Sequence, residues 1–315
     1  MINFCTYFDK NYLSRFLTLA KSLDKFNISY TFYVLCLDDF VINFFKKNYF
    51  KNIRAISLID VEDKYKSLLE AKKNRNIIEY YFTLSPFLPK YLFEKFQIAQ
   101  LSYLDSDFYF FKNPIKKIRE NLNFSTVLIK QYSDLKYGLY NVGWISYNFN
   151  YRETKEIVNL WSQQCIELCT DFPKNGFYAD QKYLDEWSQK LKYMSVDEPE
   201  CAFLSPWDKN SIIEKNLNNM LAFHFHGLRI NKTYFTSGFS KYNKKNTKNI
   251  INKIYKPYLK DLISIETKYF LKNSSIRNHS KNQFMELLIK IREIKSFLKS
   301  KYYHDYYDLK ILSSD

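Results

Sequence analysis

The feature that most constrains the fold is a largely apolar run that ends in two acidic residues. The stretch 98–104 carries no charge, and Asp105 and Asp107 follow it directly. Such a run predicts a strand buried on both faces of a sheet. Ligands of open α/β sheets bind at the carboxyl ends of the strands, and side chains two apart on an extended backbone point the same way. The two carboxylates could therefore bind one hard divalent cation, although an acidic surface turn would give the same pattern.

Strand-like and helix-like segments alternate through the first half of the chain. This alternation predicts an α/β fold with a mostly parallel, twisted sheet flanked by helices, followed by a basic, helical C-terminal appendage. We expect a catalytic domain over residues 1–235 and a basic helical region over 236–315. The expected strands span 3–7, 30–37, 55–60, 98–104, 125–130, 143–147 and 221–226. The expected helices span 12–26, 41–48, 79–96, 153–170, 250–270 and 282–298.

Composition excludes several classes of protein. The chain of 315 residues has only 5 glycines and lacks both the dinucleotide-binding glycine motif and the phosphate-binding P-loop. Most nicotinamide dehydrogenases and P-loop kinases are thereby excluded. The 5 cysteines show no paired spacing, which argues against a disulfide framework and favours a reducing compartment. We see no signal peptide and no apolar run long enough to span a membrane, so we expect a cytoplasmic protein.

Positive charge is concentrated near the C-terminus. Of the net charge of +15, residues 230–315 contribute +11, from 18 Lys and Arg against 7 Asp and Glu. Residues 1–229 hold 30 basic and 26 acidic side chains, a net charge of only +4. A basic, aromatic region of this kind could bind the anionic inner face of the cytoplasmic membrane or nucleic acid. No zinc finger, ribonucleoprotein motif or helix-turn-helix is evident, so we expect no specific nucleic-acid partner.

Two histidines follow the apolar stretch that begins at residue 221. His224 and His226 could both bind a metal ion, because imidazole is a common ligand, or they could be ordinary strand residues. Gly227 suits a close approach of the backbone to a ligand. Arg229 and Lys232 could neutralise a departing diphosphate, or they could be surface cations.

Three shorter segments each have a structural and a functional interpretation. Asp180-Gln181 could begin a helix as its N-cap, or lie near a reacting sugar carbon. Asn141, two residues before a glycine, could form a turn or bind sugar hydroxyls. Asp9, after the first expected strand, could cap a helix or line a nucleotide, since nucleotides normally lie at this loop.

Taken in order, these segments resemble one enzyme family. The five motifs are residues 5–13 (CTYFDKNYL), 103–107 (YLDSD), 140–143 (YNVG), 180–181 (DQ) and 224–227 (HFHG). They are similar to motifs of the GT-A-fold, nucleotide-sugar-dependent glycosyltransferases, in particular the glycogenin-like and lipopolysaccharide galactosyltransferase-like family. The resemblance covers roughly residues 1–230.

The resemblance implies a role for each matching residue. It implies a Mn or Mg ion held by Asp105, Asp107 and His224, with His226 beside them. It implies a nucleotide-sugar donor, a UDP-sugar first of all, bound by Thr6, Tyr7, Asp9, Asn11, Asp105, Ser106, Asp107, Gly227 and Arg229. It implies that Asp180, Gln181 and Asn141 surround the donor sugar as catalytic residues. The implied reaction is retaining sugar transfer to a hydroxyl of a glycan or lipid-linked glycan, such as lipooligosaccharide or capsule.

The chain also departs from the family pattern. Phe87 and Leu88 stand where many relatives carry an arginine before the acidic strand, and Lys130-Gln131 replaces an expected aspartate. The Lys-Pro-Trp that usually follows the histidine motif is absent. The sugar and the stereochemistry therefore stay open, and an inverting variant would use Asp180 as its base. Two other interpretations also remain, a nucleic-acid-binding protein acting through the basic region and an inactive scaffold of the same fold.

Overall fold

The computed structural model describes residues 1–231, 233–269, 295 and 298–312, and its contacts divide the chain into two compact units. We call the first the sheet unit. It comprises Met1–Lys10, Phe26–Ser106 and Asn113–Ala202. The second unit comprises Asn11–Lys25, Asp107–Lys112 and Phe203–Asp315. The expected domain boundary after residue 235 stays a prediction.

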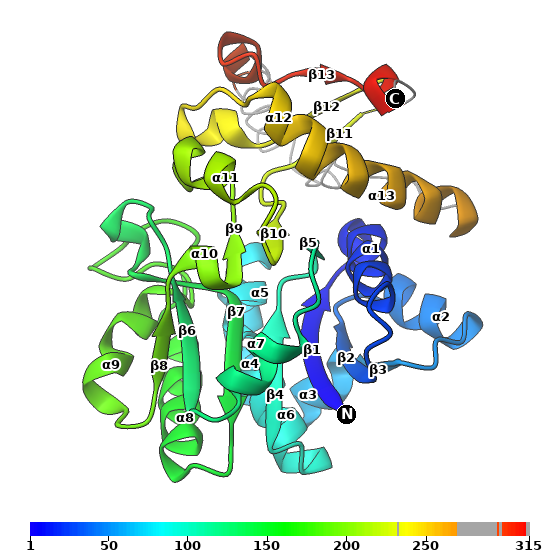
Figure 1. Ribbon diagram of the computed structural model, residues 1–315. Helices are drawn as coiled ribbons and strands as arrows, with labels where there is room; N and C mark the ends of the chain where they lie inside the picture. Colours follow the sequence, from blue (N-terminus) through cyan, green and yellow to red (C-terminus); the bar gives the residue numbers. More distant parts are fainter. Residues whose placement is uncertain (232, 270–294, 296–297, 313–315) are drawn as a thin grey trace. The chain divides into compact units, whose positions relative to one another are not determined.

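A seven-stranded sheet forms the centre of the sheet unit, with strand order β3-β2-β1-β4-β7-β6-β8 (Figure 1). Its strands are β1 (Ile2–Phe8), β2 (Tyr30–Cys36), β3 (Ile53–Ser57), β4 (Gln100–Leu104), β6 (Thr126–Lys130), β7 (Tyr140–Asn148) and β8 (Ser195–Asp197). Strands β1 to β4 are parallel, and β8 is parallel to β6. Only β7 runs antiparallel to its neighbours, β4 and β6. The expected α/β class with a mostly parallel sheet is confirmed.

Helices join and cover these strands. In the sheet unit they are α2 (Asp39–Lys47), α3 (Leu58–Lys64), α4 (Ser67–Lys73), α5 (Ile77–Thr83), α6 (Phe87–Phe96), α7 (Ile115–Asn121), α8 (Arg152–Glu167), α9 (Trp187–Lys190) and α10 (Pro199–Ala202). Asp38 caps α2, because its Oδ1 accepts a hydrogen bond from the backbone N–H of Val41 at 2.9 Å. The long helix expected over 79–96 is two helices, α5 and α6. Pro86 and Pro89 fall at the N-cap and in the first turn of α6, where proline costs little.

Most of the expected strands in this unit are confirmed, although β4 begins two residues later than expected and β3 ends earlier. Strand β3 ends at Ser57, and the chain continues as helix α3 where we expected extended backbone as far as residue 60. The reason is visible in the burial, since Val61 is fully buried while Ile59 and Asp60 are exposed. Two exposed positions followed by two buried ones, Val61 and Glu62, fit a helix turn on the surface better than a strand with alternating faces.

One side of the sheet packs against α3 to α6 and α8 in a single hydrophobic core. Leu92 from α6, Trp161 from α8, Leu101 from β4 and Ile145 from β7 are each almost completely buried there. Strand order reverses between β1 and β4, because β2 and β3 lie on one side of β1 and β4 lies on the other. Such a reversal is where ligands bind in open α/β sheets.

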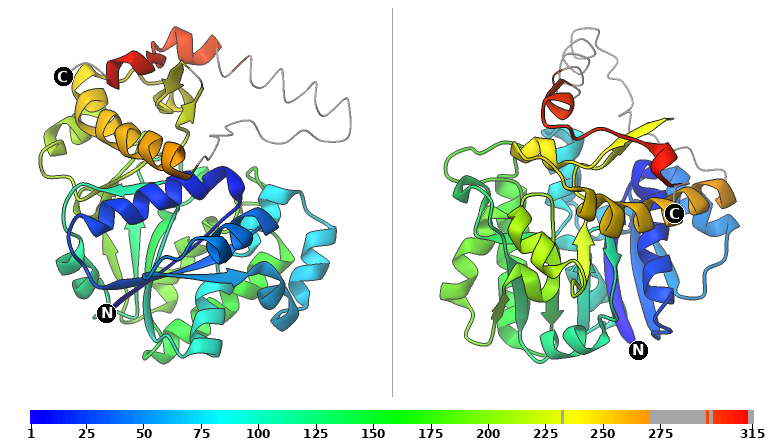
Figure 2. Two further views of the ribbon diagram at one scale, coloured as in Figure 1. Left: turned by 90° about the vertical axis from the view of Figure 1, so that its right-hand side faces the viewer. Right: turned by 45° about the horizontal axis from the view of Figure 1, so that its top comes forward.

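The second unit contains α1 (Leu13–Asp24) and most of the C-terminal part of the chain. Its other helices are α11 (Asn210–Asn216), α12 (Lys248–Ile250) and α13 (Lys256–Tyr269), and its strands are β5 (Phe108–Phe110), β9 (Phe203–Leu204), β10 (Ala222–His224), β11 (Arg229–Ile230), β12 (Tyr234–Thr236) and β13 (Tyr307–Asp308). Helix α13 lies alongside α1 (Figure 2). The strands form two three-stranded sheets, β5-β10-β9 and β11-β12-β13.

The C-terminal region thus contributes strands as well as helices. Tyr255, Tyr258 and Leu262 are fully buried in the core of the second unit. The helix expected over 282–298 lies outside the described residues, apart from positions 295 and 298. Within the part of the chain that the structure describes, no helix is both long enough and apolar enough to cross a membrane.

Candidate functional site

The two aspartates lie where the chain leaves the central sheet. Strand β4 ends at Leu104, and the backbone N–H of Asp105 donates to the carbonyl of Gly143 in β7 at 2.8 Å. The chain then turns at Ser106 and Asp107 before β5 begins. The extended backbone that we expected across the two acids is therefore wrong, and a turn brings them together instead.

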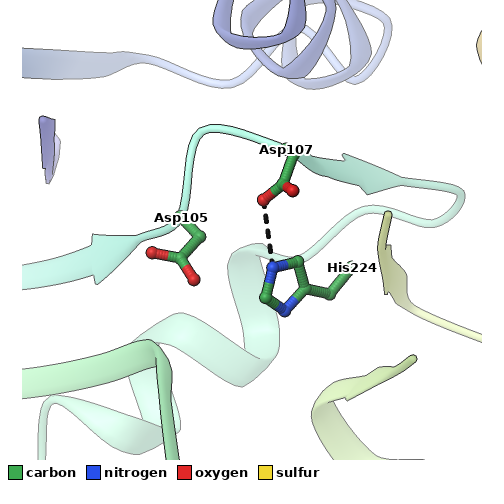
Figure 3. A group of neighbouring side chains, drawn as sticks. All are labelled: Asp105, Asp107 and His224. Carbon is green, nitrogen blue, oxygen red and sulfur yellow. Dashed lines mark ion pairs between the residues drawn. The ribbon is translucent and has the colours of Figure 1, made fainter. Parts of the chain in front are cut away.

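Asp105, Asp107 and His224 form the candidate metal centre (Figure 3). Each offers one ligand atom, and these atoms all lie within 4.8 Å of one another. Strand β10 pairs antiparallel with β5, which sets His224 opposite Phe108 and next to Asp107. His224 Nε2 lies 3.0 Å from Asp107 Oδ1. The third ligand atom belongs to Asp105, which is separated from Asp107 along the chain only by Ser106.

This set of donors fits a divalent cation. Two carboxylates and one imidazole suit Mn²⁺, and a site with few protein ligands leaves positions for phosphate oxygens. His224 and Asp107 are almost completely buried, with 3% and 5% of their surfaces exposed. A buried carboxylate is costly unless a positive charge accompanies it, so a cation would stabilise this group.

Arg15 in α1 supplies part of that positive charge. Its Nη1 lies 3.9 Å from Asp107 Oδ2, and its Nη2 donates to the carbonyl of Leu228 at 2.8 Å. Burial by itself would raise the pKa of Asp107, but His224, Arg15 and His226 together lower it well below the usual range. Sequence reasoning missed Arg15. The signal was present, because Arg15 is the one charged residue between Leu13 and Ala20 in an otherwise buried segment.

Aromatic rings fix the orientation of His224. Its ring stacks on Phe108 at 4.7 Å, and the edge of Trp207 meets it at 5.3 Å. His226 lies beside it, with ring centroids 5.7 Å apart, but is not among the three residues grouped as ligands. Burial, Lys241 and His224 lower the pKa of His226 well below its usual value, so its ring is neutral at neutral pH.

The histidine motif ends in a tight turn. Gly227 has a φ of +79°, and a Cβ on it would lie 2.9 Å from Cδ of Lys241. The left-handed backbone favours glycine here, whereas the flexible end of the Lys241 side chain could move aside. Arg229 follows in β11 and is half-buried. Lys232 lies outside the described residues.

A second cluster lies in the sheet unit around Asp180. Asp180 is 1% exposed, and neither of its carboxylate oxygens has a hydrogen-bond partner. Its pKa is raised to about 7, chiefly by burial; the Ser85 hydroxyl lowers it and the Asp105 carboxylate raises it to smaller extents. Asp180 is not a helix cap. The N-cap residue of the following 3-10 helix is Gln181, and its side chain makes no cap hydrogen bond.

Tyrosines surround this buried acid. The hydroxyl groups of Tyr7 in β1 and Ser85 are hydrogen-bonded at 2.8 Å. The Tyr103 hydroxyl donates to Asp105 Oδ1 at 2.7 Å, and the rings of Tyr7 and Tyr103 are 5.6 Å apart. Burial, together with the Asp180 and Asp105 carboxylates, raises the pKa of Tyr7 well above its usual value, which keeps the phenol protonated. Sequence reasoning did not single out Ser85 or assign Tyr103 a role.

Asn141 and Gln181 are brought together next to the start of β7. Asn141 Nδ2 and Gln181 Oε1 are 3.5 Å apart, and Asn141 Oδ1 accepts from the N–H of Gly143 at 2.7 Å. Gln181 Nε2 donates to the carbonyl of Tyr137 at 2.7 Å. Because β7 runs antiparallel to β4, its first residues lie at the same sheet edge as Asp105. The structure therefore places Asn141 and Gln181 in the same unit, and at the same edge, as Asp105.

The remaining predicted nucleotide-binding residues lie at the end of β1 and in the turn after β4. Thr6 is fully buried in β1, and Asp9 follows the strand directly. Asn11 lies in the 3-10 helix Lys10–Tyr12, and Ser106 is 6% exposed. Their contact with a nucleotide stays a prediction.

The raised pKa of Asp180 predicts how stability depends on pH. The folded chain keeps a proton on Asp180 that the unfolded chain loses above its ordinary pKa of 3.8. The contribution of this residue to stability is therefore complete below that value and declines as the pH rises to about 7. Asp180→Asn should remove this decline, so that its stability relative to the wild type is higher at pH 8 than at pH 4 by on the order of 4 kcal/mol.

Urea unfolding across this pH range measures the effect. Asp171→Asn, at an exposed position nearby in the sequence, is the matched control and should leave the wild-type profile unchanged. A wild-type profile for Asp180→Asn would contradict the assignment.

Comparison with known proteins identifies the fold of the chain. No protein-family profile matches the chain. It is 25% identical over 279 residues to the uncharacterized protein YfnD of Bacillus subtilis (strain 168), covering 82% of this chain and 88% of YfnD. Its structure is similar to the glycosyltransferase GlyE of Streptococcus pneumoniae TIGR4, with a TM-score of 0.52 and 15% identity over 90% of this chain and 66% of GlyE. It is also similar to the bifunctional glycosyltransferase WbbM, with a TM-score of 0.50 and 11% identity over 85% of this chain and 51% of WbbM. The chain therefore has a GT-A-like fold, and the resemblance predicted from its motifs is confirmed at the level of the fold.

Proposed function

We propose that the protein is a metal-dependent glycosyltransferase that moves a sugar from a nucleotide diphosphate sugar to a hydroxyl group. The observation that carries the proposal is the group of Asp105, Asp107 and His224 at the carboxyl end of β4, in a GT-A-like fold. Mn²⁺ or Mg²⁺ is the cation that suits these ligands, and a UDP-sugar is the first donor to test.

The metal ion, when bound, supplies positive charge to the departing diphosphate. The residues of the chain prepare the site for it. Arg15 and His224 keep Asp107 ionised, and Tyr103 orients Asp105 through its hydroxyl. Thr6, Tyr7, Asp9 and Asn11 are the proposed contacts of the nucleotide, joined by Ser106, Gly227 and Arg229.

Asp180, Asn141 and Gln181 are the proposed contacts of the transferred sugar. Asn141 and Gln181 offer amide groups that can bind sugar hydroxyls. A pKa of about 7 lets Asp180 exchange a proton with the acceptor at neutral pH, which an inverting reaction would need. We propose retention, as the motif resemblance implies, with a surface glycan such as lipooligosaccharide or capsule as the acceptor.

Binding of the donor is the direct test of this proposal. UDP with Mn²⁺ should raise the melting temperature of the full chain, because a ligand that binds only the folded state stabilises it. UDP or Mn²⁺ alone should raise it less. GDP and CMP under the same conditions identify the base, and release of the nucleotide from a panel of nucleotide sugars identifies the sugar. No stabilisation by any nucleotide with Mn²⁺ would indicate an inactive scaffold and refute the proposal.

Loss of one carboxylate should separate catalysis from folding. Asp105→Ala is expected to abolish Mn²⁺-dependent sugar release and to keep the wild-type melting temperature within a few degrees. Calorimetric titration with Mn²⁺ should show the loss of metal binding directly. Asp63→Ala, which removes an exposed carboxylate in α3, is the control and should behave as wild type. Wild-type turnover by Asp105→Ala would exclude Asp105 from the site.

The basic C-terminal region is the proposed contact with an anionic membrane surface. Each Lys or Arg near such a surface adds about 1 kcal/mol of attraction. The full chain should sediment with vesicles that contain phosphatidylglycerol and not with neutral vesicles. Lys248, Lys260 and Lys268 are exposed, and changing all three to Gln should weaken binding roughly 100-fold. Equal binding of the triple variant would remove this part of the proposal.

A further inference from the structure

Asp305, near the C-terminus, lies in the interior of the second unit. It has no exposed surface, and its carboxylate accepts hydrogen bonds from the chain around residue 238. The backbone N–H groups of Ser237, Gly238 and Ser240 donate to it at 2.8, 3.2 and 2.9 Å. The Ser237 hydroxyl also donates to Asp305 Oδ1. A carboxylate that accepts several backbone N–H groups makes charge-assisted bonds, which are among the stronger hydrogen bonds in proteins.

The segment that carries Asp305 is itself anchored to the unit. Strand β13 pairs antiparallel with β12, with Tyr307 opposite Phe235. The rings of Tyr306 and Tyr234 stack at 4.2 Å, and the N–H of Asp305 donates to the carbonyl of Ser300 at 2.7 Å. These contacts fix the position of the carboxylate relative to residues 237–240.

Residues 237–240, in turn, pack against the end of the histidine motif. Gly238 has a φ of +93°, and a Cβ on it would lie 2.5 Å from the carbonyl oxygen of His226 and 3.0 Å from the carbonyl carbon of Gly227. No side chain fits in that space. The backbone held by Asp305 is thus in direct contact with the backbone that follows His224 by two residues.

Side chains from the same segment continue this contact. The 3-10 helix Phe239–Tyr242 begins directly after Gly238. The ring of Tyr242 lies 6.4 Å from His226 and 6.0 Å from Trp207, and Trp207 meets His224 edge-on. One chain of contacts therefore leads from the Asp305 carboxylate to the imidazole of the candidate metal centre.

We propose that Asp305 is a positioning residue for the candidate metal centre, acting through residues 237–242 on His226, Gly227 and His224. This inference rests on the proposed function, because it requires that His224 binds the metal ion. The negative charge is needed as well as the shape, since both carboxylate oxygens of Asp305 accept N–H or O–H groups and an amide nitrogen could accept from none of them.

The test is the Mn²⁺ affinity of folded, full-length protein, measured by calorimetry in the presence of UDP. Asp305→Asn should weaken Mn²⁺ binding 10- to 100-fold, the range typical of residues that orient a metal ligand. Gly238→Ala, which keeps the carboxylate but pushes a methyl group against His226, should weaken it similarly. Asp308→Asn, three residues further along at an exposed position in β13, should bind Mn²⁺ as the wild type does.

A fourth variant separates positioning from loss of stability. Leu262→Ala removes a fully buried side chain from α13 and should lower the melting temperature without changing Mn²⁺ affinity. Wild-type affinity in folded Asp305→Asn, or an equal loss in Leu262→Ala, would overturn the inference. If Asp305→Asn does not fold, Gly238→Ala decides, and wild-type affinity there overturns it. If the wild-type protein does not bind Mn²⁺ at all, the proposed function is refuted. If the wild type binds Mn²⁺ and Asp305→Asn binds it equally well, only the role of Asp305 is refuted.

Discussion

The site depends on the pairing of the buried Asp107 carboxylate with positive charge. A carboxylate with 5% of its surface exposed would ordinarily be neutral, because burial favours the protonated form. His224 at 3.0 Å and Arg15 at 3.9 Å reverse that preference. Each of these partners is held by a different element, β10 in one case and α1 in the other. The second unit therefore folds around an ionised acid, and a metal ion bound here would replace the proton that His224 Nε2 directs at Asp107 rather than a proton on Asp107 itself.

The sheet unit also contains a buried acid, Asp180, but its pKa shifts in the opposite direction. Asp180 is at least as deeply buried as Asp107, yet no cation in the described part of the chain lowers its pKa, which rises to about 7. Trp161 donates to its backbone carbonyl at 2.8 Å and so fixes the main chain, whereas the Ser85 hydroxyl is the nearby polar group that lowers the pKa of the side chain. An inverting reaction would use two such acids, one to bind the cation and one to exchange a proton, whereas retention would leave Asp180 as a contact of the sugar. Burial and charge separate the pKa values of the two residues, although the residue type is the same.

Much of the sheet could be predicted from the sequence, because uncharged runs such as 98–104 leave few alternatives to a buried strand. The candidate ligands could also be predicted, because Asp105, Asp107 and His224 each end or follow an apolar strand. The turn at Ser106 could not, since nothing in the local sequence distinguishes it from continued extension. Arg15 stands out as a lone charge in an apolar segment, but its role, like that of Asp305, could not be predicted. Their partners lie far away in sequence, 92 residues from Arg15 to Asp107 and 68 from Asp305 to Ser237, and such contacts follow only from the tertiary fold.

The C-terminal strands affect the candidate metal centre because they hold Asp305 in place. A carboxylate buried among backbone N–H groups stabilises the structure only when all of its donors are in place, and an incomplete set would leave costly unpaired groups. Asp305 therefore favours one arrangement of residues 237–240 over the alternatives. Because Gly238 leaves no room for movement against His226, that choice also limits where the histidine backbone can lie. The geometry of the candidate metal centre is in this way set by residues that never contact the ion.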